Sequence, residues 1–114
     1  MSACQECLLD KFPLTCSAFL GHLACMDFLI SNGADVNEMN DHGNQALIYV
    51  SYKGYLDCIQ LLISNDADIS QKNSQGYTAL DYAYLGKQSD SIGFLRNLNE
   101  NGQDLGPKFA NKLY

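Results

Sequence analysis

The chain has few basic residues, and this scarcity limits what it can bind. Its 114 residues include seven Lys and Arg against thirteen Asp and Glu, which gives a formal net charge of −6. Proteins that bind nucleic acid neutralise phosphates with clustered positive charge. The composition therefore disfavours nucleic acid as a partner, and it equally disfavours an acidic protein.

Long apolar runs are also missing. No stretch approaches the ~18 apolar residues that a membrane-spanning helix needs, so we expect no membrane association. The first residues, MSACQECLLDK, have neither the basic start nor the long apolar segment of a signal peptide. Apolar residues make up 46% of the chain and charged residues 18%, as in ordinary soluble globular proteins. These features predict a single domain over residues 1–114, located inside the cell, in the cytoplasm or the nucleus.

Metal ligands are too few for a structural zinc site. Cys4 and Cys7 have the CxxC spacing of half such a site, but no second CxxC follows, and the histidines are only His22 and His42. A structural zinc ion usually takes four Cys or His ligands. The sequence also contains no Gly-rich phosphate loop and no nucleophile elbow. We therefore expect no metal and no cofactor.

The cysteine count indicates a reduced protein. There are five cysteines, an odd number that does not suit a disulfide scaffold. The last three fall inside apolar helical patterns, where cysteine behaves as a small buried hydrophobe: Cys16, Cys25 and Cys58.

A seven-residue motif occurs twice, as SNGADVN at 31–37 and as SNDADIS at 64–70. It could be a duplicated ligand site or the same turn of a repeated structure. A gapless shift of 33 residues favours the repeat, because it aligns identical residues along the whole chain. Among the matched pairs are Gly21 with Gly54, Cys25 with Cys58, Asn40 with Asn73, Gly43 with Gly76, and Tyr49 with Tyr82. Three units result, at about 7–39, 40–72 and 73–105, followed by a tail at 106–114.

Each unit predicts two short helices. The first begins near Pro13, Ala46 or Ala79 and ends near a glycine about eight residues later. Thr78 followed by Asp81 resembles a capping box. The second helix reads LDCIQLLIS in the middle unit, with its apolar residues on one face.

The second helix should end at a residue with positive φ, which is Gly33 in the first unit and Asp66 in the next. Helices this short are unstable alone and must bury their apolar faces against neighbouring units. The repeated motif is therefore interpreted as one structural corner used twice.

With these features the sequence resembles the ankyrin-repeat family. The resemblance rests on PLTCSAFLGHLACMDFLISNGADVN in the first unit, NDHGNQAL in the second and NSQGYTALDYA in the third. It implies an all-α solenoid of helix–loop–helix pairs, with hairpin or loop fingers projecting to one side.

Some positions depart from the family pattern. The family's histidine in the first helix is replaced by Thr15, Ile48 and Asp81, so its hydrogen bonds must be lost or remade. In the third unit Lys87 replaces the inter-helix glycine, and Tyr84 stands where the other units have a small residue. The third unit also lacks the corner motif, which suits a C-terminal cap. The N-terminal CQECLLDKF is a degenerate finger, and an uncovered apolar edge there predicts weak self-association of an otherwise monomeric protein.

Members of this family mostly bind other proteins and catalyse nothing, and the resemblance implies the same role here. An alternative is a cysteine-dependent enzyme built on Cys25 and His22. Core packing is the better interpretation of Cys25, because its equivalent Cys58 has no histidine nearby.

The family's binding face is the concave one, formed by finger tips and first helices. Carried over by position, the resemblance assigns to it Phe19, Leu20, Asp41, His42, Asn44, Tyr52, Lys53, Ser74, Gln75, Tyr77 and Leu85. Five of these are bulky groups expected to be exposed as interface anchors, with partial core burial as the alternative: Phe19, Leu20, Tyr52, Tyr77 and Leu85.

A different function is also implied by the resemblance. In family members the asparagine of the corner motif can be hydroxylated by an asparaginyl hydroxylase. Asn37 matches that position, and the equivalent Ser70 does not.

Overall fold

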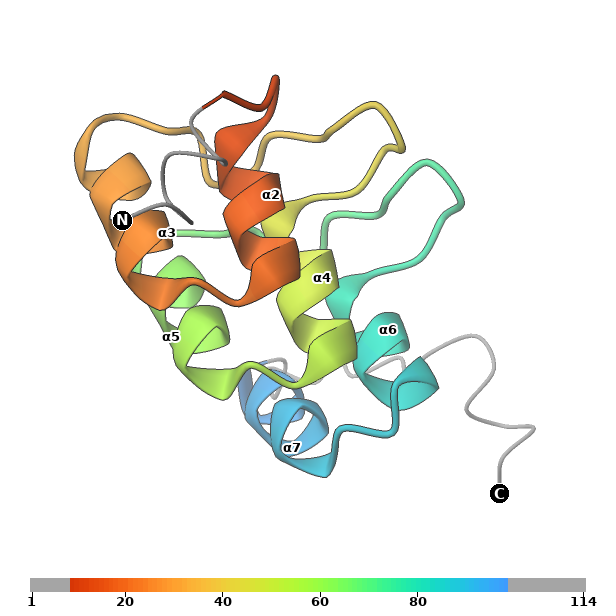
Figure 1. The fold of residues 1–114 in the computed structure, drawn as a ribbon. Helices are drawn as coiled ribbons and strands as arrows, with labels where there is room; N and C mark the ends of the chain where they lie inside the picture. Colours follow the sequence, from red (N-terminus) through yellow and green to blue (C-terminus); the bar gives the residue numbers. More distant parts are fainter. Residues whose placement is uncertain (1–8, 99–114) are drawn as a thin grey trace.

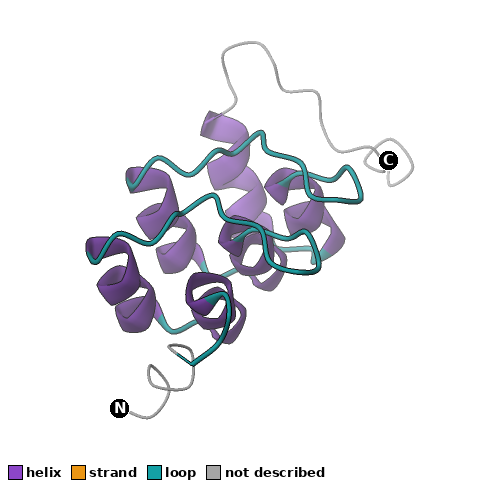
Figure 2. Ribbon diagram, turned by 90° about the horizontal axis from the view of Figure 1, so that it is seen from above, coloured by secondary structure: helices purple, strands orange, loops and turns teal. Residues whose placement is uncertain are grey.

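The computed structural model describes residues 9–98 of the chain. This range contains helices and loops and no strand (Figure 2). The helices are α2 (Pro13–Leu20), α3 (Leu23–Ser31), α4 (Ala46–Lys53), α5 (Leu56–Ser64), α6 (Ala79–Leu85) and α7 (Ser89–Leu98). The all-α fold class predicted from the sequence is confirmed. Residues Cys4, Cys7 and Leu8 and the C-terminal tail lie outside the described range.

The helices form two layers. The first helices of the pairs, α2, α4 and α6, lie in one row, and the second helices, α3, α5 and α7, lie in a second row beside it, to the left and below in Figure 1. Two long loops connect the pairs and project together to the side of the first helices (Figure 1). We call residues 38–44 the first finger and residues 71–77 the second finger.

The starts of the helices follow from local sequence. Pro13 occupies the first turn of α2, where its missing N–H is not needed. Thr78 and Asp81 form the predicted capping box at α6: each side chain accepts a hydrogen bond from the other residue's backbone N–H, at 3.3 and 2.9 Å. Asp81 thus takes one of the positions of the missing family histidine and serves as a helix cap there.

In the third repeat the glycine after the first helix lies one position earlier than in the other two repeats, and contacts in the stack explain this displacement. In the first two repeats the residue after the first helix is glycine in the left-handed region, with φ of 73° at Gly21 and 77° at Gly54. In the third repeat Lys87 takes the left-handed conformation, with φ of 57°, while Gly86 has φ of −82°. Gly86 is needed for space, because a Cβ there would overlap the carbonyl oxygen of Tyr52.

The corner after the second helix is the same in both repeats that contain the motif. Gly33 has φ of 95° and Asp66 has φ of 69°, so the predicted positive φ is confirmed at both. The N–H of Ala34 bonds back to the carbonyl of Leu29, and the N–H of Ala67 to that of Leu62, both at 3.0 Å. The two motif copies are therefore one turn formed twice.

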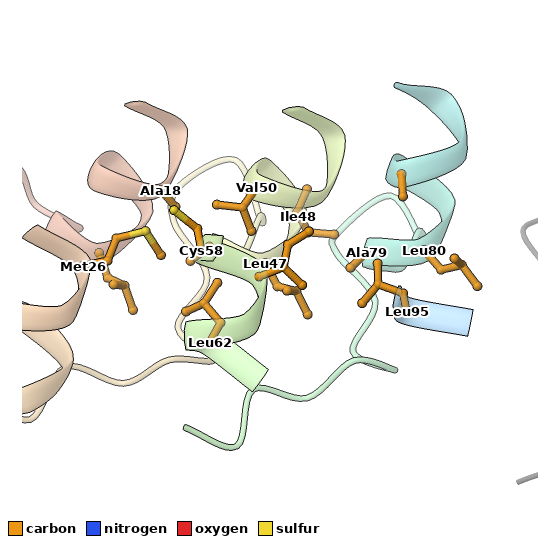
Figure 3. Packing of buried hydrophobic residues seen from close by; sticks show 14 of the residues in the cluster. Ala18, Met26, Leu47, Ile48, Val50, Cys58, Leu62, Ala79, Leu80 and Leu95 are labelled. Atoms are coloured by element: carbon orange, nitrogen blue, oxygen red, sulfur yellow. The ribbon is translucent and has the colours of Figure 1, made fainter. Parts of the chain in front are cut away.

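The core runs through the stack without interruption. Small residues separate the first helices, and Ala18, Ala46 and Ala83 are 0% exposed. Larger side chains fill the space between the two layers, including Met26, Leu62 and Leu95 (Figure 3). Because each helix buries its apolar side against neighbouring pairs, the stack is stabilised as a unit.

Candidate functional site

Three large apolar side chains project from equivalent positions of the three first helices. Phe19, Tyr52 and Leu85 follow each other at intervals of 33 residues, in the last turns of α2, α4 and α6. Their side chains are 47%, 45% and 53% exposed. We call these three residues the stripe. The exposure predicted for them from the sequence is confirmed, and it is also confirmed for Leu20, at 42%.

Tyrosines of the following repeat hold the aromatic residues of the stripe in place. The ring of Phe19 lies edge-on to Tyr49, with ring centroids 5.5 Å apart. Tyr52 makes the equivalent contact with Tyr82 at 6.3 Å. Edge-to-face contact is a favourable arrangement of aromatic rings and restricts their rotation. The Nζ of Lys53 lies 4.1 Å from the centre of the Phe19 ring, in a cation–π contact. The two aromatic residues of the stripe are therefore exposed but held in place by these contacts.

An asparagine fixes each finger. In the second finger the side-chain oxygen of Asn73 accepts hydrogen bonds from the backbone N–H groups of Gln75 and Tyr77, at 3.0 and 2.9 Å. Its side-chain nitrogen donates to the hydroxyl of Tyr82 at 3.0 Å and to Asn44 Oδ1 at 2.8 Å. Asn73 is only 6% exposed, so its amide is a structural centre of the finger.

The first finger repeats this arrangement. Asn40 Oδ1 accepts from the backbone N–H groups of His42 and Asn44, both at 3.0 Å, and Asn40 Nδ2 donates to the Tyr49 hydroxyl at 2.9 Å. In both fingers, an asparagine amide and a tyrosine hydroxyl therefore form the polar centre of the turn.

The two fingers are joined directly. The backbone N–H of Ser74 donates to the carbonyl of Gly43, and its hydroxyl donates to the carbonyl of His42, both at 3.2 Å. A side chain at Gly43 would collide with the Ser74 hydroxyl, so glycine is needed for this close approach. The fingers run next to each other as one connected surface (Figure 2).

A pocket of about 350 Å³ lies at the N-terminal end of this surface, between α2 and the first finger. Aromatic rings of Phe12, Phe19 and Tyr49 line it, together with polar groups at its rim. Lys11 and Asp41 form an ion pair across the rim at 3.4 Å, with both side chains largely exposed. A pocket with aromatic walls and a polar rim suits one large apolar side chain of a partner.

The other residues assigned to the face divide into two groups. Asp41, His42, Ser74 and Gln75 are exposed on the fingers, and Lys53 is half-buried. Asn44 and Tyr77 are also only half-buried. Asn44 Nδ2 donates to Tyr49, its Oδ1 accepts from Asn73, and the Tyr77 ring packs against Tyr82 at 5.8 Å. For Tyr77 the expected exposure is therefore replaced by partial burial against the neighbouring ring.

Sequence reasoning did not assign Phe12, Tyr49 or Tyr82 to the face. The repeat contains a signal for the two tyrosines. Tyrosine recurs after 33 positions at Tyr49 and Tyr82, and asparagine recurs in the same way at Asn40 and Asn73, so a repeated pairing between the two could be inferred from the sequence. Phe12 has no counterpart, since the equivalent positions hold Gln45 and Thr78.

Two of the three cysteines within residues 9–98 lie in the core. Cys25 is 4% and Cys58 2% exposed, as predicted, and Cys16 is half-buried. Burial raises the pKa of the Cys58 thiol, and the Asp57 carboxylate raises it further. A nucleophilic cysteine needs a lowered pKa and access, and Cys58 has neither. Within residues 9–98, no three His, Cys, Asp or Glu side chains are grouped as a metal site.

Asn37 lies half-buried in the first corner and connects two repeats. Its Oδ1 accepts a hydrogen bond from the backbone N–H of Asp68 at 2.8 Å, and its carbonyl accepts one from Gln71 Nε2 at 3.4 Å. The side-chain amide is thus part of the contact between neighbouring corners.

The comparison with protein families agrees with this geometry. A model described as ankyrin repeats, in three copies, matches residues 14–108. The chain belongs to the ankyrin-repeat family. Proteins of this family are generally protein–protein interaction modules and typically non-catalytic. A search of curated proteins gave no match. No helix in the described part of the chain is long and apolar enough to cross a membrane.

Proposed function

We propose that this protein is a non-catalytic module that binds a partner protein through the surface formed by the fingers and the first helices. The observation that carries the proposal is the stripe: each of three successive repeats exposes a large apolar side chain at the same position. Ordered, exposed aromatic groups are typical anchors of protein interfaces, because they bury much area with little loss of side-chain entropy.

The partner should contribute a bulky apolar anchor. The pocket between Phe12, Phe19 and Tyr49 is large enough for one such side chain, and the stripe continues from it along the stack. The polar finger residues would then form the rim of the interface, where Asp41, His42, Ser74 and Gln75 remain close to water.

The test begins with affinity capture from the native host followed by mass spectrometry, comparing the wild-type protein with the double variant Phe19→Ala/Tyr52→Ala. For the partner identified, calorimetry should show a loss of about 2–4 kcal/mol in the double variant. Phe28→Ala is a matched control, since Phe28 is an exposed phenylalanine of α3, at 51%, in the second layer. Circular dichroism should show the same helicity in all forms.

Equal affinity of the wild type and the double variant would mean that the binding face is misassigned. Equal losses in the double variant and in Phe28→Ala would point to a general destabilisation of the stack.

We also propose that the side chain of Asn37 can be hydroxylated, and that this requires the corner to open locally. An asparaginyl hydroxylase would act on a locally opened corner, because the Asn37 amide bonds to the backbone of Asp68 in the closed one. Peptide mapping by mass spectrometry, after incubation with such an enzyme, should show a mass increase of one oxygen at Asn37 and none at Ser70. No increase in either the folded or the unfolded protein would remove the proposal.

A further inference from the structure

A groove lies in the layer of second helices, between α3 and α5. α3 and α5 run side by side, on the side of the molecule away from the fingers (Figure 1). The groove has a volume of about 590 Å³. Its lining residues come from both helices and are Leu23, Ala24, Asp27, Asp57, Gln60, Leu61 and Ser64.

The groove follows from the way the repeats stack. Small residues allow α2 and α4 to pack closely, whereas α3 and α5 touch much less extensively. The second layer is therefore more open than the first, and apolar groups remain accessible between its helices. Leu23 is 39% exposed, Ala24 is exposed and Leu61 is half-buried. These three residues give the groove an apolar strip.

The charge of the groove has one sign. Asp27 of α3 and Asp57 of α5 both line it, and both are exposed. Neither helix contains a lysine or an arginine. Within residues 9–98 the ion pair that forms is Lys11 with Asp41, on the finger side, so the two groove carboxylates have no cationic partner there. Cationic groups placed in the groove would be attracted to these carboxylates.

We propose that this groove binds a basic amphipathic helix of a partner protein. Apolar side chains of that helix would lie against Leu23 and Leu61, and flanking lysines or arginines would face Asp27 and Asp57. A helix fits because its ridge of side chains packs naturally between two neighbouring helices. The groove and the stripe belong to different layers, so one molecule could hold two proteins at once.

The probe is a designed helical peptide of about 18 residues, with leucines on one face and lysines beside them. Titration of the 15N-labelled protein should give saturable binding, with amide shifts concentrated at the groove residues of α3 and α5. A peptide with glutamate in place of every lysine should not bind.

Matched variants test the role of charge. Asp27→Asn/Asp57→Asn should weaken binding of the lysine peptide by about 3- to 30-fold, as expected for the loss of two exposed ion pairs. Asp66→Asn/Asp90→Asn changes the net charge equally, at two exposed acids outside the groove, and should leave the affinity within about twofold. Leu23→Ser, tested separately, should also weaken binding.

Three results would overturn the proposal: no saturation up to about 1 mM peptide, equal binding of the lysine and glutamate peptides, or shifts centred on the fingers and the stripe. None of these concerns the partner captured through Phe19 and Tyr52, so the groove and the proposed function can fail independently.

Discussion

The corner after the second helix occurs twice, so backbone strain can be relieved in one copy by Asp66→Gly and introduced in the other by Gly33→Ala. Gly33 and Asp66 occupy equivalent places, and both have positive φ, at 95° and 69°. Glycine adopts this region freely, whereas a residue with a Cβ is strained there. Asp66 is exposed, and no hydrogen bond or ion pair of its side chain is found within residues 9–98. Asp66→Gly should therefore remove strain without removing a contact.

The expected change in the free energy of unfolding on Asp66→Gly is the difference between two effects. Relief of the left-handed conformation contributes about 1–2 kcal/mol, and the greater freedom of glycine in the unfolded chain offsets about 0.5–1 kcal/mol. Asp66→Gly should raise the free energy of unfolding by about 0.5–1 kcal/mol, or the Tm by about 2–6 °C in a domain of this size. Urea and thermal denaturation followed by circular dichroism would measure it.

The reverse change provides the control. A Cβ at Gly33 would meet no atom within 4 Å, so Gly33→Ala adds backbone strain without a steric clash. It should lower the free energy of unfolding by about 1 kcal/mol. A lower Tm for Asp66→Gly, or an unchanged Tm for Gly33→Ala, would refute the assignment of strain at the corner.

Further predictions concern the third repeat, the finger network and the core. Lys87→Gly should raise the free energy of unfolding by about 0.5–1 kcal/mol, since Lys87 has φ of 57°. Gly86→Ala should lower it by about 1–3 kcal/mol, because the new Cβ would overlap the Tyr52 carbonyl. Thermal denaturation of the two variants measures both changes. Asn73→Ala should reduce the free energy of unfolding in urea by about 2–4 kcal/mol, against less than about 0.5 kcal/mol for exposed Asn97→Ala. Gln45 is 3% exposed with both side-chain polar atoms unpaired in the described structure, so Gln45→Met should raise stability by about 1 kcal/mol, with exposed Gln60→Met as a neutral control. Folding raises the pKa of the Cys58 thiol, so the neutral thiol stabilises the folded state at a pH below the unfolded pKa of about 8.5. This contribution to the free energy of unfolding should decrease as the pH rises through the folded pKa. Denaturation curves of a Cys58→Ala variant should lack this decrease.

The sequence predicted the fold because its signals are local and repeated. A period of 33 residues, the proline and capping box at helix starts and the glycines after the first helices locate the described helices closely. The positive φ at Asp66 could also be predicted, because Gly33 holds the same place in the other copy.

Other features depend on contacts that repeat patterns do not specify. The displacement of glycine to position 86 comes from the approach of the Tyr52 carbonyl, which only the stacked structure reveals. Tyr77 and Asn44 were expected on the surface, but Tyr82 of the same repeat packs against Tyr77, and Asn73 of the following repeat bonds to Asn44. The acidic groove combines residues from α3 and α5, and it exists because the second layer is more open than the first.

A partner protein is expected to bind across the stripe and the fingers. Hydrogen exchange of the protein, measured with and without the partner obtained by affinity capture, tests it most directly. With the partner bound, we expect slower exchange in both fingers and in the last turns of α2, α4 and α6, around Phe19, Tyr52 and Leu85. Protection confined to other segments, with the stripe and fingers exchanging at their free rates, would contradict it.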